Sequence, residues 1–448
     1  SSGGDRIVVE AGTYAPFTVS NAVIMLGYRG ASNTVVDGGG ILRPITITAP
    51  AILEGFTVQN GSAEDCGGVL ADNGAILRDI RIANSQATAP GGYGGGLCLY
   101  NGSIAEDVTV VSNQAQYGAG IYATATSEVH SSTIAWNTSG SGWGGGVYLE
   151  DAGTLADSLV EGNSSARGGG VYAVDSEIAT TTIRGNLASE YGGGVALFGG
   201  TLRNSWIEDN DSWNGAGIYA SDALVHNSVV NGNIASARGG GVYLAGTGAV
   251  YNLTVVTNQA ATGAGGVWIN GSGSLLNSIV MNNAPSNLAP GAGSVQYSCI
   301  SPAPSGIGNF DADPLFVETN DYHLRAGSSC IDAGTNEAWM TQVQDIDGQR
   351  RVCSMPADNP SGVVRDVWTD IGADEASVDA FSRPSPGNPF WGWNVVVDAR
   401  LRMQTSTNLV LAVWTNTGNV VTANQATLTI PYTNSDRIRS FRLIWVRP

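Results

Sequence analysis

Three charged side chains recur at nearly equal intervals in the middle of the chain: Glu161, Arg184 and Glu208. If the chain repeats at that interval, carboxylates two repeats apart lie roughly 9–10 Å from each other, near the upper end of the separation used by inverting glycosidases. Arg184 between them should favour the ionised form of both carboxylates, whereas a general acid must hold its proton. We therefore expect a ladder of ion pairs rather than an acid–base pair.

Other catalytic groups are sparse. The chain contains no lysine, and its three histidines, His130, His226 and His323, lie far apart without a matching carboxylate motif. A polysaccharide lyase needs a cationic base, and a Ser-His-Asp triad needs a turn that exposes its nucleophile. Neither pattern is present, so the sequence favours a protein without catalytic residues.

Acidic residues gather near the end of the first 376 residues. Four of them are calcium candidates, because Ca²⁺ prefers hard oxygen ligands in glycine-containing turns: Asp345, Asp347, Asp370 and Asp374. The alternative is that these carboxylates cap turns and pair with Arg350, Arg351 and Arg365.

Aromatic and arginine side chains form two regularly spaced rows. The first row contains Tyr93, Tyr117, Trp143, Arg167, Tyr191, Asn214 and Arg238, and the second contains Tyr122, Tyr148, Tyr172, Tyr219, Tyr243 and Trp268. The first row could form a platform for a polysaccharide, or its members could simply stack on one another. Strand alternation places the second row on the outside, where it could stack between repeats or contact a neighbouring subunit.

These rows are positioned by a repeat of about 24 residues, which is typical of a solenoid. Its first marker is a Gly-Gly-Gly or Gly-Ala-Gly triplet that begins at Gly94, Gly118, Gly144, Gly168, Gly192, Gly215, Gly239 and Gly263. Its second marker is an asparagine after an apolar pair, at Asn60, Asn84, Asn113, Asn137, Asn163, Asn186, Asn210, Asn233, Asn258 and Asn283.

Short runs rich in Val, Ile and Thr fill the space between the markers, and none is long enough for a helix. Three short strands per repeat, stacked at the ~4.8 Å spacing between strands, predict a right-handed parallel β-helix of about 12 coils. The asparagines should then form a hydrogen-bonded ladder.

We expect four segments along the chain. Residues 1–292 should form the β-helix, and 293–376 an Asp-rich closing segment of the same domain. Residues 377–390 read as a proline-rich linker, and 391–448 as a small β-sandwich-like module.

Five cysteines are present. Cys66 precedes its glycine pair whereas Cys98 follows its triplet, so the two are expected to be out of register and unbridged. Cys299 and Cys330 are a plausible disulfide, with Cys353 as the rival partner.

The composition limits the partners. The net charge of −18 should repel polyanions, so nucleic acid is an unexpected partner. No apolar run is long enough for a membrane span. No signal sequence is present, so the chain is expected to be either cytosolic or already processed. The acidic, lysine-free solenoid favours a processed, exported protein.

Several motifs together resemble the exported bacterial right-handed parallel β-helix repeat proteins of the choice-of-anchor type. The motifs lie at 12–14, 36–39, 53–61 and 279–283, in the glycine triplets, and in the closing stretches 313–316, 322–325, 330–334, 345–351 and 370–375. The resemblance implies a surface or secreted location and no catalytic residues. The C-terminal strands resemble modules attached to other exported proteins.

The sequence therefore predicts a non-catalytic extracellular structural or adhesive protein without a cofactor, calcium excepted. Head-to-tail self-association into a filament or sheath is a further hypothesis, because the end of a solenoid can template another chain. The alternative is a carbohydrate-binding or carbohydrate-active β-helix protein of the lyase or glycosidase type.

Overall fold

The computed structural model describes residues 4–289, 291, 293–318, 321–325, 327–336, 340, 344–346 and 369–374, and the strand residues 381–382, 390–394, 400–406, 415–416, 421–422, 427–431 and 440–445. These residues contain strands and no α-helix, so none of them forms a helix that could cross a membrane. The chain divides into two compact units. The first comprises residues up to Pro314 together with Ile371–Ala373, and the second comprises Leu315–Asp370 and the residues from Asp374 onward.

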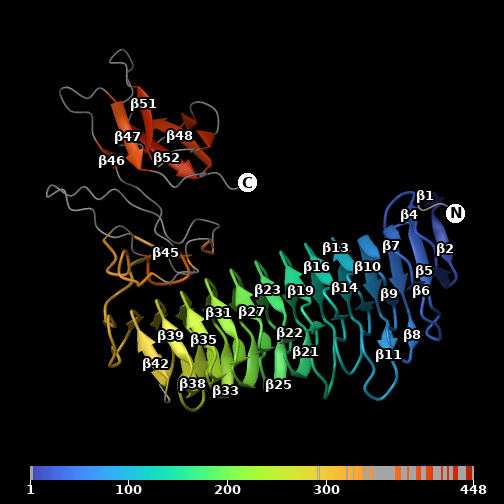
Figure 1. Ribbon diagram of the computed structural model, residues 1–448, viewed down its shortest axis with the longest axis horizontal. Coiled ribbons are helices and arrows are strands. Elements are labelled where there is room, and N and C mark those ends of the chain that lie inside the picture. The colour runs from blue at the N-terminus through green and yellow to red at the C-terminus, as the bar shows by residue number, and fades with distance from the viewer. Residues whose placement is uncertain are drawn as a thin grey trace. The chain divides into compact units, whose positions relative to one another are not determined.

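The first unit is a parallel β-solenoid, in which each coil stacks on the previous one (Figure 1). Its strands form three parallel sheets, here called sheets A, B and C, with 24, 12 and five strands. Sheet B receives one strand from each coil, so the predicted solenoid of about 12 coils is confirmed.

The strands of sheet A are β1 (Asp5–Val9), β2 (Gly12–Tyr14), β4 (Val23–Gly27), β5 (Thr34–Asp37), β7 (Ile52–Gln59), β10 (Ile76–Ala83), β13 (Ile104–Glu106), β14 (Thr109–Val111), β16 (Glu128–His130), β17 (Thr133–Ala135), β19 (Thr154–Ala156), β20 (Leu159–Glu161), β23 (Glu177–Ala179), β24 (Thr182–Arg184), β27 (Thr201–Arg203), β28 (Trp206–Glu208), β31 (Leu224–His226), β32 (Val229–Asn231), β35 (Ala249–Tyr251), β36 (Thr254–Val256), β39 (Ser274–Leu276), β40 (Ile279–Met281), β42 (Ser294–Gln296) and β43 (Cys299–Ile300).

The strands of sheet B are β3 (Phe17–Val19), β6 (Ile45–Ile47), β9 (Val69–Ala71), β12 (Leu97–Leu99), β15 (Ile121–Ala123), β18 (Val147–Leu149), β22 (Val171–Val174), β26 (Val195–Phe198), β30 (Ile218–Ser221), β34 (Val242–Gly246), β38 (Val267–Gly271) and β41 (Leu288–Ala289). Sheet C contains β21 (Ser164–Arg167), β25 (Leu187–Tyr191), β29 (Asp211–Asn214), β33 (Ile234–Arg238) and β37 (Gln259–Ala260). The short pair β8 (Ser62–Ala63) and β11 (Gln86–Ala87) lies outside the three sheets.

The core is a stack of aliphatic side chains along the solenoid axis. In β17, β20 and β24, for example, Ile134, Val160 and Ile183 lie in register and are fully buried. Side chains alternate between the two faces of a strand, so the flanking residues of each strand point outward. The apolar core therefore fixes which residues reach the surface.

The predicted asparagine ladder is confirmed from Asn113 onward. Asn186 is representative: its backbone N–H and Nδ2 donate to Asn210 Oδ1 at 2.9 and 3.0 Å, and its Nδ2 also donates to the carbonyl of Val160 at 3.0 Å. The same pattern continues through Asn283, which donates to Asn287 Oδ1. These side chains thus satisfy buried backbone groups at every coil.

Asn60 and Asn84 do not belong to this ladder, contrary to the expectation. The ladder position in their coils is Gly61 and Ser85, and Ser85 donates its backbone N–H to Asn113 Oδ1 at 2.9 Å. Asn60 and Asn84 precede it by one residue and adopt a left-handed backbone, with φ of 52° in both. The sequence marker is therefore shifted by one residue in these two coils.

The glycine triplets allow neighbouring coils to approach closely. Gly144 has φ of 64°, and a Cβ on the next residue, Gly145, would lie 2.5 Å from the carbonyl oxygen of Gly169 in the following coil. The first glycine is thus favoured by its backbone conformation and the third by lack of space, whereas the second position also accepts alanine, as at Ala119, Ala216 and Ala264.

The parallel pairing continues past the expected boundary at 292, because β42 pairs with β39 and β43 pairs with β40. Residues 371–373 return to this unit: Gly372 N donates to Asn277 O at 2.9 Å, and Ala373 N donates to Thr254 Oγ1 at 3.0 Å. Within the expected closing segment, residues 293–376, only part of the chain thus continues the coils of the solenoid.

The second unit contains antiparallel strands. These are β44 (Phe316–Glu318), β45 (Asp321–Leu324), β46 (Phe381–Ser382), β47 (Phe390–Asn394), β48 (Arg400–Ser406), β49 (Thr415–Asn416), β50 (Val421–Thr422), β51 (Thr427–Pro431) and β52 (Ser440–Trp445). β46, β47 and β51 form one small sheet, and β48, β49, β50 and β52 form another.

The ladder yields a stability prediction. We expect Asn186→Ala to lower the free energy of unfolding by about 1–3 kcal/mol, because it leaves the carbonyl of Val160 and the amide of Asn163 without their partners. Thermal and denaturant unfolding would measure the change, with Gln114→Ala as a control that removes an exposed amide outside the ladder. Equal stability of the two variants would contradict this role of the ladder.

Candidate functional site

The second aromatic row lies on strands of sheet B, and the first row lies beside it, where sheet C ends and the chain turns toward sheet B. In the first row, ring centroids of Tyr93 and Tyr117 are 5.1 Å apart, and those of Tyr117 and Trp143 are 5.2 Å apart. Arg167 continues this row, with its guanidinium 5.4 Å from the Trp143 ring and 5.1 Å from the Tyr191 ring. Arg238 instead stacks on Trp268 of the second row at 4.8 Å.

The second row is mostly buried, which differs from the expected exposed column. Tyr122, Tyr148 and Tyr172 are each 7% exposed and belong to a cluster separate from the central core. First-row rings cover them: Tyr93 lies 4.7 Å from Tyr122, and Trp143 lies 5.0 Å from Tyr172 in a stacked arrangement. The alternation of side chains along a strand predicts that these rings point outward, but it does not predict that the first-row rings bury them.

The second row tolerates one interruption. Ala196 occupies the position of a tyrosine, and Phe198, two residues further along the same strand, fills the gap. The ring of Phe198 lies 5.3 Å from Tyr172 and 5.7 Å from Tyr219. The ring stack therefore continues across the coil that lacks its tyrosine.

Glu150 links two of the buried rings. The phenol of Tyr122 donates to Glu150 Oε1, and the phenol of Tyr148 donates to Glu150 Oε2 at 3.0 Å. Burial, together with the nearby Glu150 carboxylate, raises the pKa of Tyr122 and of Tyr148. Burial also raises the pKa of Tyr100 and of Tyr172 to about 12. These phenols stay protonated at neutral pH, and those of Tyr122 and Tyr148 donate hydrogen bonds.

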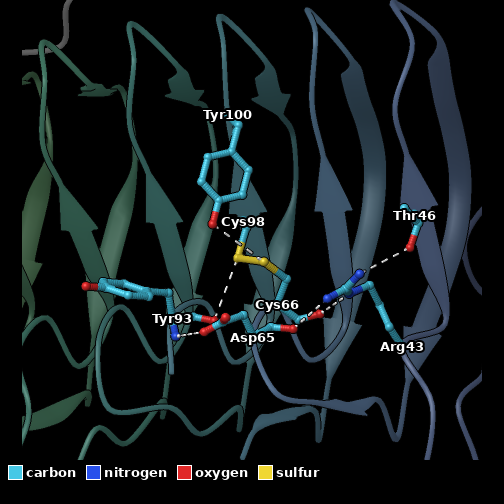
Figure 2. The surroundings of a disulfide bond; sticks show 7 residues. All are labelled: Arg43, Thr46, Asp65, Cys66, Tyr93, Cys98 and Tyr100. Atoms are coloured by element: carbon cyan, nitrogen blue, oxygen red, sulfur yellow. Dashed lines mark hydrogen bonds between the residues drawn. A yellow bond between two sulfur atoms is a disulfide. The ribbon is translucent and has the colours of Figure 1, made fainter. Parts of the chain in front are cut away.

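A disulfide between Cys66 and Cys98 closes one end of the second row, contrary to the expectation that they are out of register (Figure 2). The Cα atoms are 5.3 Å apart. Cys66 occupies the first-glycine position of its coil with φ of 51°, and this turn folds back on the strand. A Cβ on the equivalent Gly94 would lie only 2.3 Å from Cys98 Sγ. An extended backbone would place Cys66 and Cys98 out of register, whereas the turn at Cys66 brings the two side chains together.

The disulfide segment is held by the coils on both sides (Figure 2). Arg43 donates from Nε to the carbonyl of Cys66 and from Nη2 to that of Asp65, both at 2.8 Å. Tyr93 donates its backbone N–H to Asp65 Oδ1 at 2.9 Å. The first ring of the first row, Tyr93, is thus anchored beside the disulfide.

The charged column lies on sheet A and forms only half of the expected ladder. Glu161, Arg184 and Glu208 are in register, and Arg184 Nη2 lies 2.8 Å from Glu161 Oε2. Burial, reinforced by Asp209, raises the pKa of Glu208 and outweighs the opposing effect of Arg184. The expectation that Arg184 would lower the pKa of both carboxylates therefore does not hold for the net shift of Glu208.

The calcium candidates remain a prediction. Asp345, Asp370 and Asp374 are buried, and Asp370 Oδ1 accepts the backbone N–H of Asp332 at 2.7 Å. No group of three or more His, Cys, Asp or Glu in the described residues is placed to hold a metal ion. Asp347 lies outside those residues.

The predicted second disulfide also remains a prediction. Cys299 is buried in the first unit, with its Sγ 3.2 Å from the carbonyl of Ala312. Cys330 is buried in the second unit, and Cys353 lies outside the described residues.

Comparison with known proteins identifies the class of the solenoid. Residues 118–284 match the family model described as "Right handed beta helix region", so these coils form a right-handed parallel β-helix. A search of curated protein sequences finds no match.

Two solved structures are similar at low identity. Pectate lyase Pel9A is 15% identical with a TM-score of 0.38, over 83% of this chain and 88% of that chain. The catalytic unit of a thermostable GH87 α-1,3-glucanase from Streptomyces thermodiastaticus strain HF3-3 is 12% identical with a TM-score of 0.36, over 69% of this chain and 64% of that chain. Neither likeness assigns a substrate to this chain.

The disulfide yields a prediction for the first coils. It joins residues with a sequence separation of 32, and closing a loop of that size should stabilise the folded chain by about 3–4 kcal/mol in the chain-entropy account. We expect a reductant to lower the melting temperature of the intact protein. Cys66→Gly, which restores the glycine of the repeat, is the control and should respond less. Equal responses of the two proteins would contradict the role of this disulfide.

The buried tyrosines yield a pH prediction. The pKa of Tyr100 and of Tyr172 rises from 10.0 to about 12 in the folded chain. Their contribution to stability should therefore be complete below pH 10.0 and should be lost as the pH rises through about 12. Ultraviolet titration of tyrosinate alongside thermal unfolding would measure both effects. Titration of every tyrosine near the ordinary value in the folded protein would contradict this account.

Proposed function

We propose that this chain is a non-catalytic, exported β-helix protein of the adhesive type, which binds a neutral polysaccharide along the first aromatic row. The observation that carries this proposal is the row of half-buried rings Tyr93, Tyr117 and Trp143, spaced by 5.1 and 5.2 Å. This spacing is comparable with the length of one pyranose unit. Successive sugars could therefore lie on successive rings.

The buried second row supports a binding role for the first. Each half-buried ring packs on a ring beneath it, as Trp143 does on Tyr172, so its orientation is set before a ligand arrives. A rigid aromatic surface loses little conformational entropy on binding. This is the arrangement expected for weak repeated contacts that add up along a polymer.

The charge distribution favours a neutral polymer. The net charge of −18 repels polyanions, and the guanidinium of Arg167 is already paired with Glu190 at 2.6 Å. Glu150 adds a carboxylate beneath the same face. An acidic polysaccharide would therefore meet repulsion at Tyr93, Tyr117 and Trp143, where the neighbouring cation, Arg167, is already paired.

The surroundings of the rings also argue against chemistry on this face. The raised pKa of Tyr122 and of Tyr148 keeps these phenols protonated, so they are poor bases. A protein that holds its ligand without converting it is the simpler account of such a surface.

Export is part of the proposal. The Cys66–Cys98 disulfide supports it, because such bonds persist in oxidising compartments. Head-to-tail self-association stays a hypothesis. The surface it would use is β1, where Ile7 and Val8 are 44% and 50% exposed.

One observation favours a second candidate, a glycosidase-like activity on sheet A. Burial raises the pKa of Glu208, which is the direction a general acid requires, and Glu161 lies two coils away in the same column. Incubation with neutral polysaccharides and measurement of reducing ends would test it. If the intact protein releases reducing ends and Glu208→Gln abolishes this release, the protein is an enzyme rather than a non-catalytic adhesive protein.

The binding proposal is tested with Trp143→Ala. We expect the intact chain to be retarded in affinity gels containing a neutral polysaccharide, and the substitution to weaken binding about tenfold, or ~1.4 kcal/mol, because one ring of the platform is lost. The control is Trp136→Asn, since Trp136 is 65% exposed but lies at a turn with φ of 56° beside the asparagine ladder. The proposal fails if no neutral polysaccharide is bound, or if both variants lose affinity equally.

A further inference from the structure

A polar pocket opens at a different corner of the solenoid from the aromatic rows. Its volume is about 640 Å³, and its walls come from the turns that follow β5, β7, β10 and β14. The residues with side chains around it include Asp37, Asn60, Asn84, Ser112 and Gln114, and no apolar side chain lines it. Its size lies within the range of about 300–1,000 Å³ that is usual for ligand sites, but its lining is far more polar.

The one-residue shift of the asparagine marker creates this lining. From Asn113 onward the amide occupies the ladder position and is buried between coils. In the two earlier coils Gly61 and Ser85 take that position, and the amides belong to Asn60 and Asn84 in the left-handed turn. Asn84 is therefore exposed, and both amides line the pocket instead of the interior.

Asp37 fixes one wall of the pocket. Its carboxylate accepts hydrogen bonds from Gln59 Nε2 and the backbone N–H of Gly39, both at 2.8 Å, and from Asn60 Nδ2 at 3.0 Å. The bond from Gln59, followed by that from Gly39, lowers the pKa of Asp37, so it stays ionised. Because Asn60 donates its amide group to Asp37, its Oδ1 is left as an acceptor for a ligand.

The other wall offers uncommitted polar groups. The side chains of Asn84, Ser112 and Gln114 make no hydrogen bond to any other described part of the chain. Together they supply two primary amides and one hydroxyl, each of which can both donate and accept.

We propose that this pocket binds a neutral, hydroxyl-rich ligand, namely a segment of a neutral oligosaccharide. Sugar hydroxyls donate and accept at adjacent positions, as primary amides do. An anion would face Asp37 and the net charge of −18, and an apolar ligand would leave the polar groups of the lining residues without partners. A metal ion would find a single carboxylate that is already committed to three neighbours. This site goes beyond the proposed function, because the aromatic row contributes no residue to it.

The test uses the full chain carrying Trp143→Ala, so that binding to the aromatic row is weakened. Isothermal titration with maltohexaose, cellohexaose and laminarihexaose measures binding, and hexagalacturonate is the acidic comparison. We expect at least one of the three neutral hexasaccharides to bind. Asn84→Gly or Gln114→Ala should weaken its affinity about 3- to 10-fold, because each substitution removes one or two hydrogen bonds. Glycine preserves the left-handed turn at residue 84.

Asn282→Gly is the matched control, because Asn282 is exposed at the same turn position with φ of 58° but does not line the pocket. It should leave the affinity unchanged. The inference is overturned if no neutral hexasaccharide binds the Trp143→Ala chain, if hexagalacturonate binds equally well, or if the pocket substitutions have no more effect than Asn282→Gly. If Trp143→Ala alone abolishes binding, the aromatic platform is supported and the pocket is refuted. If only the pocket substitutions weaken binding, the pocket is supported and the aromatic platform is refuted.

Discussion

The structure depends on keeping every coil in register with the next, and the asparagine ladder is the interaction that does so inside the solenoid. Each amide bonds both to the side chain of the next coil and to a backbone carbonyl of the previous one, as Asn186 does with Asn210 and Val160. A shift by one residue would leave buried polar groups without partners, which costs about 1–3 kcal/mol for each group. Register is therefore strongly specified over the coils from Asn113 to Asn283.

Fixed register turns single residues into columns. A tyrosine in the same repeat position of successive coils must stack on its neighbours at roughly the strand spacing. The aromatic double row follows from this geometry, and so does the substitution of Phe198 for the ring missing at Ala196. The same rule explains the pocket, since a change at Gly61 and Ser85 releases the neighbouring asparagines to the surface.

Repetition made the fold predictable, and interruptions of the repeat limited the prediction of sites. The glycine triplets and most asparagine markers indicated the β-helix, its strands and its ladder from spacing alone. The Cys66–Cys98 bond was missed because Cys66 adopts the folded-back conformation of a glycine, which linear counting does not represent. The raised pKa of Glu208 was missed because it results from burial, and a sequence pattern gives charge order but not exposure. The pairs Asn60-Gly61 and Asn84-Ser85 could have predicted the pocket. In both pairs a glycine or a serine follows the asparagine and takes the ladder position in its place.

The central claim is that the outer edge of sheet B holds a neutral glycan through the first aromatic row. The most direct measurement is a crystal structure of the chain with a neutral oligosaccharide bound. We expect sugar rings to lie on Tyr93, Tyr117 and Trp143, one ring to each coil, with the buried tyrosines unmoved. A sugar held instead across Glu161 and Glu208 on sheet A, with no occupancy on the aromatic row, would contradict it.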